Sequence, residues 1–245
     1  MKAFRPGSAC KTTSTCMGQR RVPVSRKVEA LADRDVDLVV THVGRTIPTP
    51  WPEWRGGWPG EIEAALIDAV LSIRARYGSD GTGVRAAIRR WRDANPDRPR
   101  LDDLGELARM DHDRLALLLD NRQVLSGGLP KPDAIKAAVE ALTGVGVRHA
   151  HDVGPLVSAQ QAAHTGVRGL GPVSWEYFLM LLGHPGVKAD TWIRRFVADA
   201  IGRGSEASEA GSLVKAAAAA LGVDPTALDH AIWRHMSGIT GAHPA

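Results

Sequence analysis

Two short stretches of the chain carry residue types and spacings that could do chemistry. The first, "GVRGLG" (166–171), is a double-glycine turn directly before an apolar run. The second, "KADTWIRRF" (188–196), contains the carboxylate of Asp190, nineteen residues after Gly171. Glycine turns let backbone amides approach an anion, and a fixed carboxylate can stabilise a developing positive charge or orient a water molecule. The two stretches therefore indicate an anion-binding turn followed by one acidic group.

Helices must position both features. Residues 158–164 predict a short helix before the turn, and Trp175, Phe178 and Leu182 share one face of a helix that starts near residue 173. The free N–H groups and positive dipole end of that second helix favour an anion such as a DNA phosphate. A tight turn between two packed helices is the alternative interpretation.

Asp190 also has two interpretations. It directly precedes a predicted helix over 191–201, whose buried stripe includes Ile193, Phe196 and Val197. Asp and Thr before a helix are ordinary N-caps, because the side-chain oxygen accepts from first-turn amides. Taken alone, Asp190 is explained as a cap.

Taken together, the turn and the acid resemble the helix-hairpin-helix (HhH-GPD) DNA glycosylase superfamily. Its members have an apolar-x-Gly-apolar-Gly hairpin, then an apolar helix, then an Asp that opens another helix at a similar distance. Here the hairpin is Val167 to Gly171, and the acid lies in the string Ala189-Asp190-Thr191-Trp192. The resemblance covers roughly residues 58–205 and is closest over 158–202.

The resemblance implies an all-α fold of two helical lobes over residues 28–245, with the hairpin at 158–182 and the active cleft between the lobes. The hairpin and Asp190 would come from the lobe made by the middle of the chain, and early and C-terminal helices would build the other. The implied function is a DNA glycosylase that flips out a damaged or modified base and hydrolyses its N-glycosidic bond, leaving an abasic site. Asp190 would be the catalytic carboxylate, and no cofactor is implied beyond a structural monovalent cation at the hairpin.

Three departures from the family pattern narrow the activity. Bifunctional members carry a lysine two residues after the second hairpin glycine, and that position is Val173 here. Without that amine no Schiff base forms there, so we expect a monofunctional enzyme without β-lyase activity. Trp192 stands two residues after the Asp, where many family members have a histidine. The chain has two cysteines, Cys10 and Cys16, and these cannot hold the four-cysteine iron–sulfur cluster of some family members.

Further site residues follow from the same resemblance. The DNA contacts it implies are Val167, Arg168, Gly169, Gly171 and Arg194, with Arg195 as the alternative to Arg194. An enzyme that flips a nucleotide needs a wedge and an aromatic or apolar pocket. The wedge candidates are Asn121, Arg122, Gln123 and Leu125, and the pocket candidates are Tyr77, Trp175 and Trp192. A polar loop and ordinary core aromatics are the alternative interpretations.

The charge of the chain is unevenly distributed. The net charge is +4, but residues 1–27 hold seven of the 31 basic residues and no acid. The rest has 24 basic and 27 acidic residues, a net charge of −3. The basic character therefore belongs to a tail that we predict to be disordered, either as a DNA-contacting arm or as a product of a false start upstream of Met17.

The remaining pattern is helical throughout. Period-3.6 stripes predict helices at 36–43, 62–73, 84–92, 104–107, 111–120, 135–142, 208–221 and 225–237 in addition to those above. A Pro/Gly-rich connector with three tryptophans (45–60) interrupts them, and these rings either fasten the connector across both lobes or line a cleft. No apolar run is long enough to span a membrane, and the scattered histidines give no matched metal-ligand face.

Three hypotheses remain from the sequence. The first is a monomeric, cytoplasmic, nucleoid-associated glycosylase that acts in DNA repair or in antiviral defence against modified phage DNA. The second is a non-catalytic helix-hairpin-helix protein that only binds DNA, with Asp190 as a cap. The third is a helical protein without a nucleic-acid partner, which the −3 charge of the body favours.

Overall fold

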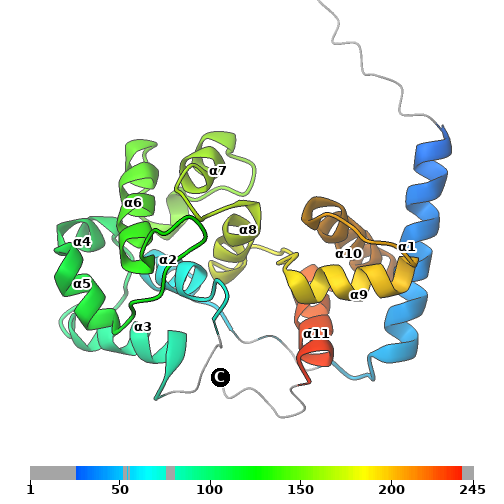
Figure 1. Cartoon of the computed structure of the whole chain (residues 1–245), viewed down its shortest axis with the longest axis horizontal. Coiled ribbons are helices and arrows are strands. Elements are labelled where there is room, and N and C mark those ends of the chain that lie inside the picture. Colours follow the sequence, from blue (N-terminus) through cyan, green and yellow to red (C-terminus); the bar gives the residue numbers. More distant parts are fainter. Residues whose placement is uncertain (1–25, 52–53, 55, 76–80, 239–245) are drawn as a thin grey trace, which may run out of the picture.

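The part of the chain that the structure describes folds into helices joined by loops and turns. The computed structural model describes residues 26–51, 54, 56–75 and 81–238 (Figure 1). These ranges hold eleven α-helices, one 3-10 helix (Ala150–Asp152) and no strand, which confirms the all-α prediction. The α-helices are α1 Arg26–Thr46, α2 Ile62–Leu71, α3 Gly83–Asp93, α4 Leu104–Arg109, α5 His112–Leu119, α6 Lys131–Gly144, α7 Ser158–Thr165, α8 Pro172–Leu181, α9 Thr191–Ile201, α10 Ala207–Leu221 and α11 Pro225–Ser237.

Two sequence predictions fall outside these ranges or at their edge. Tyr77, a pocket candidate, lies outside the described residues, as do residues 1–25 of the predicted tail. Residues 26 and 27, which the sequence assigned to that tail, are the first two residues of α1. None of the described helices combines the length and apolar character that a membrane crossing needs.

Helix α2 is the centre of a first hydrophobic core built by α2 to α8 (Figure 1). The sequence predicted one apolar face on α2, but all ten of its residues are buried. The reason is that α3, α6 and α8 all pack against it. Two acids, Glu63 and Asp68, are therefore buried with it and need hydrogen-bond partners.

The first and last parts of the chain build a second core. Helix α1 packs against α9 and α10, and α11 packs against both of these (Figure 1). The predicted valine stripe of α1 faces this core, with Val39 and Val43 buried, and Phe196 and Val214 lie opposite. Residues far apart in the sequence therefore share one core.

Two connectors join the cores. The first connector lies between α1 and α2. Its Trp51 packs against the second core, whereas its Trp54 and Trp58 pack against the first core. This division favours tryptophans that fasten the connector to both bodies. The second connector, residues 182–190, joins α8 to α9 and carries Asp190 at its end.

His164, on α7, lies fully buried under the hairpin. Its ring stacks on Phe178 and is tilted against Trp175, and its Nε2 lies 3.0 Å from the Ser174 hydroxyl. Nδ1 has no hydrogen-bond partner among the described residues. Burial lowers the pKa of His164 to about 4, so the folded protein holds it neutral.

This histidine predicts acid sensitivity. In the unfolded chain an imidazole has a pKa near 6.5. Between pH 6.5 and pH 4 the unfolded state therefore binds a proton at His164 that the folded state does not bind, which favours unfolding. Stability should be complete above pH 6.5 and fall by up to about 3 kcal/mol as the pH drops to 4. Urea unfolding of wild type and His164→Gln at pH 7, 6, 5 and 4 measures this, and equal pH slopes in the two proteins would contradict it.

Candidate functional site

The predicted hairpin is a turn between α7 and α8. Val167 and Leu170 are buried and anchor the turn, and the Leu170 amide donates to the Val167 carbonyl at 3.0 Å. Gly169 has φ +91°, a left-handed conformation that favours glycine. Arg168 is exposed between these anchors. The turn therefore presents Arg168 and backbone, rather than the side chain of Val167, to an outside ligand.

The hairpin packs against the loop that the sequence proposed as a wedge. A Cβ at position 169 would lie 2.7 Å from the Leu125 Cβ and 3.1 Å from the Ser126 carbonyl oxygen. The aliphatic part of Arg168 runs beside Gly127 of the same loop. Hairpin and loop thus form one continuous surface, although more than forty residues separate them in the sequence.

The two hairpin glycines differ in what they tolerate. We expect Gly169→Ala to destabilise the protein by about 1–3 kcal/mol, because the left-handed backbone and the close Leu125 contact both oppose a methyl group. Gly171 has extended backbone and nothing within 4 Å of an added Cβ, so Gly171→Ala should keep its stability. Thermal unfolding of both variants measures the difference. A larger loss of stability in Gly171→Ala would contradict it.

The loop over residues 121–130 uses its polar side chains internally. The Asn121 side chain accepts from the Gln123 amide at 3.0 Å, and the Gln123 side chain accepts from the Lys131 amine at 2.6 Å. Leu125 is 5% exposed, whereas the neighbouring Val124 is 57% exposed. Because successive side chains of an extended segment point to opposite sides, a buried Leu125 leaves Val124 outward. Val124, which the sequence interpretation missed, is the exposed apolar side chain beside the hairpin.

Asp190 is the N-cap of α9. Its Oδ1 accepts from the Trp192 amide at 2.8 Å and from the Ile193 amide at 3.4 Å. The interpretation of Asp190 as a helix N-cap is therefore confirmed. Oδ2 has no hydrogen-bond donor among the described residues, and the side chain is partly exposed. One carboxylate oxygen holds the helix and the other is free to meet a ligand.

The position of Asp190 corrects the expectation that it belongs to the lobe of the hairpin. Its flanking residues Ala189 and Ile193 lie in the second core, whereas the hairpin residues Val167 and Leu170 lie in the first. The carboxylate thus stands at the end of the connector between the two cores. Backbone contacts of this connector explain its position: the Gly186 amide donates to the Thr226 hydroxyl of α11 at 3.0 Å.

Lys188, two residues before Asp190, meets residues of α8 and α11 at this junction. The Lys188 amine lies 3.6 Å from the centre of the Tyr177 ring, and the Tyr177 hydroxyl is 3.4 Å from Asp68 Oδ1. The Lys188 backbone amide donates to Asp229 Oδ1 at 2.9 Å. We call these residues the junction cluster: Asp68, Tyr177, Lys188, Asp190 and Asp229.

The charges of the junction cluster act on each other. Burial lowers the pKa of Lys188, although the charges of Asp190, Asp68 and Asp229 oppose the change. Burial raises the pKa of Asp229 well above its usual value, and the nearby Asp190 adds to this effect. Asp68 accepts from Trp58 Nε1 at 2.9 Å and from the Ser72 hydroxyl at 2.7 Å. The cluster combines one amine with carboxylates in a partly desolvated place.

One other predicted site residue, Trp175, is corrected, and the predicted DNA contact of Arg194, which is exposed, stays a prediction. Trp175 is 1% exposed and packs against His164 and Phe178, so it belongs to the core rather than to a pocket. Arg194 Nε donates to the Ser205 carbonyl at 3.0 Å, which braces the turn between α9 and α10. Of the arginine pair after Asp190, Arg195 is instead the one near Trp192, with its guanidinium 5.8 Å from the ring centre.

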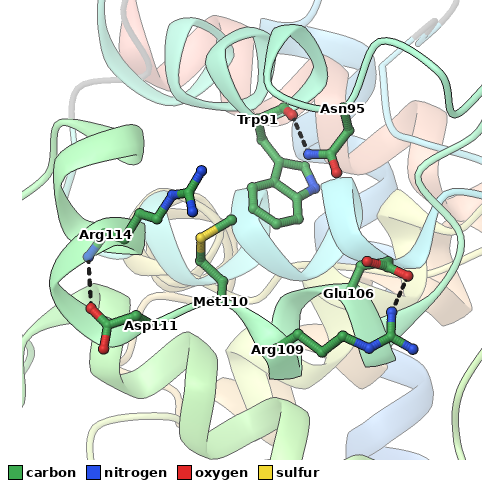
Figure 2. A pocket seen from close by; sticks show the side chains of 7 residues that line it. All are labelled: Trp91, Asn95, Glu106, Arg109, Met110, Asp111 and Arg114. Atoms are coloured by element: carbon green, nitrogen blue, oxygen red, sulfur yellow. Dashed lines mark hydrogen bonds and ion pairs between the residues drawn. The ribbon is translucent and has the colours of Figure 1, made fainter.

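A surface pocket of about 240 Å³ lies on the first core, away from the junction cluster. Its lining residues are Trp91, Asn95, Glu106, Arg109, Met110, Asp111 and Arg114 (Figure 2). Three of its charged side chains are already engaged: Arg109 pairs with Glu106, and the Asp111 side chain accepts from the Arg114 backbone amide at 3.2 Å. It contains none of the residues that the sequence or the junction singles out. The described residues also contain no group of three or more His, Cys, Asp or Glu side chains that could hold a metal ion.

Comparison with known proteins gives one match. The model of a protein family described as a domain of unknown function (DUF8548) matches residues 38–237. This range covers both cores and both connectors. No curated protein and no solved structure matches the chain.

Proposed function

We propose that this chain, which belongs to the DUF8548 family of domains of unknown function, is a DNA N-glycosylase that flips out and hydrolytically excises a damaged or modified base. The observation that carries the proposal is the carboxylate of Asp190. It stands at the junction of the two cores with one oxygen free, downstream of a hairpin whose second glycine faces open space. The proposal needs one carboxylate and an anion-binding turn, and it assigns these roles to Asp190 and to the hairpin.

The chemistry assigned to Asp190 is electrostatic. Breaking the N-glycosidic bond leaves positive charge on the sugar and negative charge on the departing base. A carboxylate fixed beside C1′ stabilises the cation, and it can also orient or deprotonate the attacking water. Because Oδ1 is held by two amides of α9, the position of Oδ2 is fixed before the substrate arrives. Bases that are already good leaving groups suit such a site best.

The hairpin and its neighbouring loop supply the DNA contacts in this proposal. Backbone amides at the hairpin and the start of α8 would bind one phosphate, and exposed Arg168 would add charge. Val124 would fill the gap left by the flipped nucleotide, since wedges in duplex DNA are commonly apolar. Trp192, partly exposed beside Arg195, is the described aromatic candidate for the base pocket.

A second candidate function is a DNA-binding protein without catalysis. The observation that favours it is the cap itself, since Asp190 already has a structural task at the start of α9. In that case the hairpin would bind phosphate and Asp190 would hold a helix.

The experiment that tests the proposal counts abasic sites. Purified protein is incubated with alkylated, deaminated, oxidised and phage-hypermodified DNA, and new abasic sites are labelled with an aldehyde-reactive probe. New sites on one of these DNAs would support the glycosylase and identify its substrate class. Salt-dependent DNA binding without any new site would favour the second candidate, and absence of both would reject the two together.

A further inference from the structure

The second connector is held from two sides. On the side of the first core, a Cβ added to Gly186 would lie 2.8 Å from Met180 Cγ of α8, so the connector packs closely against this helix. On the side of the second core, two side chains of α11 bind its backbone. The Thr226 hydroxyl accepts from the Gly186 amide at 3.0 Å, and Asp229 Oδ1 accepts from the Lys188 amide at 2.9 Å. A shift of the connector would therefore break contacts with both cores.

The two side chains of α11 act on the connector from one face of their helix. Thr226 and Asp229 are three residues apart, a spacing that places side chains on the same face of a helix. They are 6% and 7% exposed, and buried polar groups need hydrogen-bond partners. Both find a partner in the connector, whose residues 184–190 have no regular secondary structure. Helix α11 thus gives this irregular segment a defined position.

A series of hydrogen bonds leads from Asp229 to the candidate catalytic carboxylate. Asp229 holds the amide of Lys188, and the Lys188 carbonyl accepts from the Asp190 amide at 2.6 Å. The Asp190 side chain in turn accepts from the Trp192 amide at 2.8 Å. Because residues 188 and 190 are bonded to each other, a displacement of the first also displaces the second.

We propose that Asp229 is a positioning residue of the glycosylase, which fixes the Asp190 carboxylate beside the sugar by holding the Lys188 amide. The inference rests on the proposed function, because the place of Asp190 affects a reaction only if Asp190 takes part in one. Asp229 is buried and acts without touching the DNA. A misplacement of about 1 Å at a reacting group can lower a rate about 100-fold, so such support matters to catalysis.

This role needs an oxygen of Asp229 and not its negative charge. Burial raises the pKa of Asp229 well above its usual value, and the charge of Asp190 adds to the effect. A second negative charge is therefore disfavoured at this position. An uncharged amide oxygen also accepts from a backbone amide. Asp229→Asn should therefore keep the contact with Lys188, whereas Asp229→Ala removes it.

Single-turnover excision on the DNA identified by the abasic-site assay is the first measurement. We expect Asp229→Ala to lower the maximal rate about 10- to 100-fold, with little change in the DNA concentration that gives half of this rate. Asp229→Asn should excise like wild type. Asp224→Ala is the matched control, because it removes the N-cap of α11 without touching the connector, and it should also excise like wild type. Asp229→Val, which lacks an acceptor but fills more of the space, replaces Asp229→Ala if that variant does not fold.

Amide hydrogen exchange is the second measurement, and it needs no activity. The amides of Trp192 and Ile193 donate to the Asp190 side chain, so their exchange shows whether the carboxylate stays in place. In Asp229→Ala we expect their exchange to become at least about tenfold faster, and in Asp229→Asn it should match wild type. Asp224→Ala should speed exchange only at the start of α11.

Three results would overturn the inference. These are wild-type excision and exchange in a folded Asp229→Ala, a loss in Asp229→Asn as large as in Asp229→Ala, and an equal loss in Asp224→Ala. The two measurements also separate this inference from the proposed function. If wild type excises no base but Asp229→Ala alone exchanges faster, the glycosylase is rejected and the positioning of Asp190 by Asp229 is kept. If wild type and Asp229→Ala excise and exchange alike, the positioning role is rejected and the glycosylase is kept.

Discussion

Asp190→Asn is expected to lower the rate of base excision about 100- to 1000-fold, as loss of one well-placed electrostatic group does in other enzymes. The melting temperature should stay within about 2 °C of wild type. An asparagine oxygen caps a helix as well as an aspartate oxygen does, so the amides of Trp192 and Ile193 keep an acceptor. In the proposed glycosylase the variant loses the negative charge that would stand beside the sugar, so the excision rate should fall while the stability is kept. Single-turnover excision on the DNA identified by the abasic-site assay measures the rate.

A matched control for this variant is Asp224→Asn. Asp224 caps α11 in the same way, with bonds of 2.9 and 3.0 Å to the amides of Thr226 and Ala227. It does not belong to the junction cluster, so its substitution should leave excision unchanged. An Asp190→Asn protein that excises at the wild-type rate would remove Asp190 from the reaction and leave it as a cap.

Glu63→Ala should have the largest effect on stability, a loss of about 3–5 kcal/mol. Glu63 is fully buried on α2. It accepts from Trp91 Nε1 at 2.9 Å and from the Asp103 amide at 2.8 Å, and it pairs with Arg98. Removing the carboxylate would leave the partly buried guanidinium of Arg98 without this counter-ion, and the Trp91 and Asp103 donors without their acceptor. Chemical denaturation at pH 7 gives the free energy of unfolding.

The comparison for Glu63 is a surface acid in the same core. Glu106 pairs with Arg109, whose side chain is 64% exposed, so Glu106→Ala should cost less than about 1 kcal/mol. If both alanine variants lose similar stability, the Glu63 network contributes far less than its geometry implies.

Much of the fold could be predicted because it is local. The valine stripe of α1 and the stripe of α9 each follow a period of 3.6 residues, and both stripes face the second core. Helix α2 was misjudged because a stripe on one face says nothing about what packs on the other. Glu63 and Asp68 are the only charged residues of α2, so the helix has no strongly polar face for solvent. That low charge was the sequence signal that the whole helix is buried, with both acids bonded to donors in the interior.

The candidate site was only partly predictable because its members meet through tertiary structure. Asp190 and the hairpin glycines were found from a spacing along the chain. Lys188 meets Tyr177 and Asp229 only once α8, the connector and α11 are in place, and no sequence period encodes such a contact. Val124 was missed for the same reason, since its exposure follows from the packing of Leu125 under Gly169.

The pairing of the first helix with the last three affects how the protein is made. Helix α1 leaves the ribosome first. Val39 can be buried only after more than 150 further residues have been synthesised, when Ile193 and its neighbours in the second core appear. At about 5–20 residues per second, that interval lasts roughly eight to thirty seconds. Helices α2 to α8 can bury their own apolar residues as they emerge, while the valines of α1 remain uncovered. The nascent chain therefore carries an exposed apolar stripe on α1 through most of its synthesis, and a truncated product that ends before α9 would keep this stripe exposed.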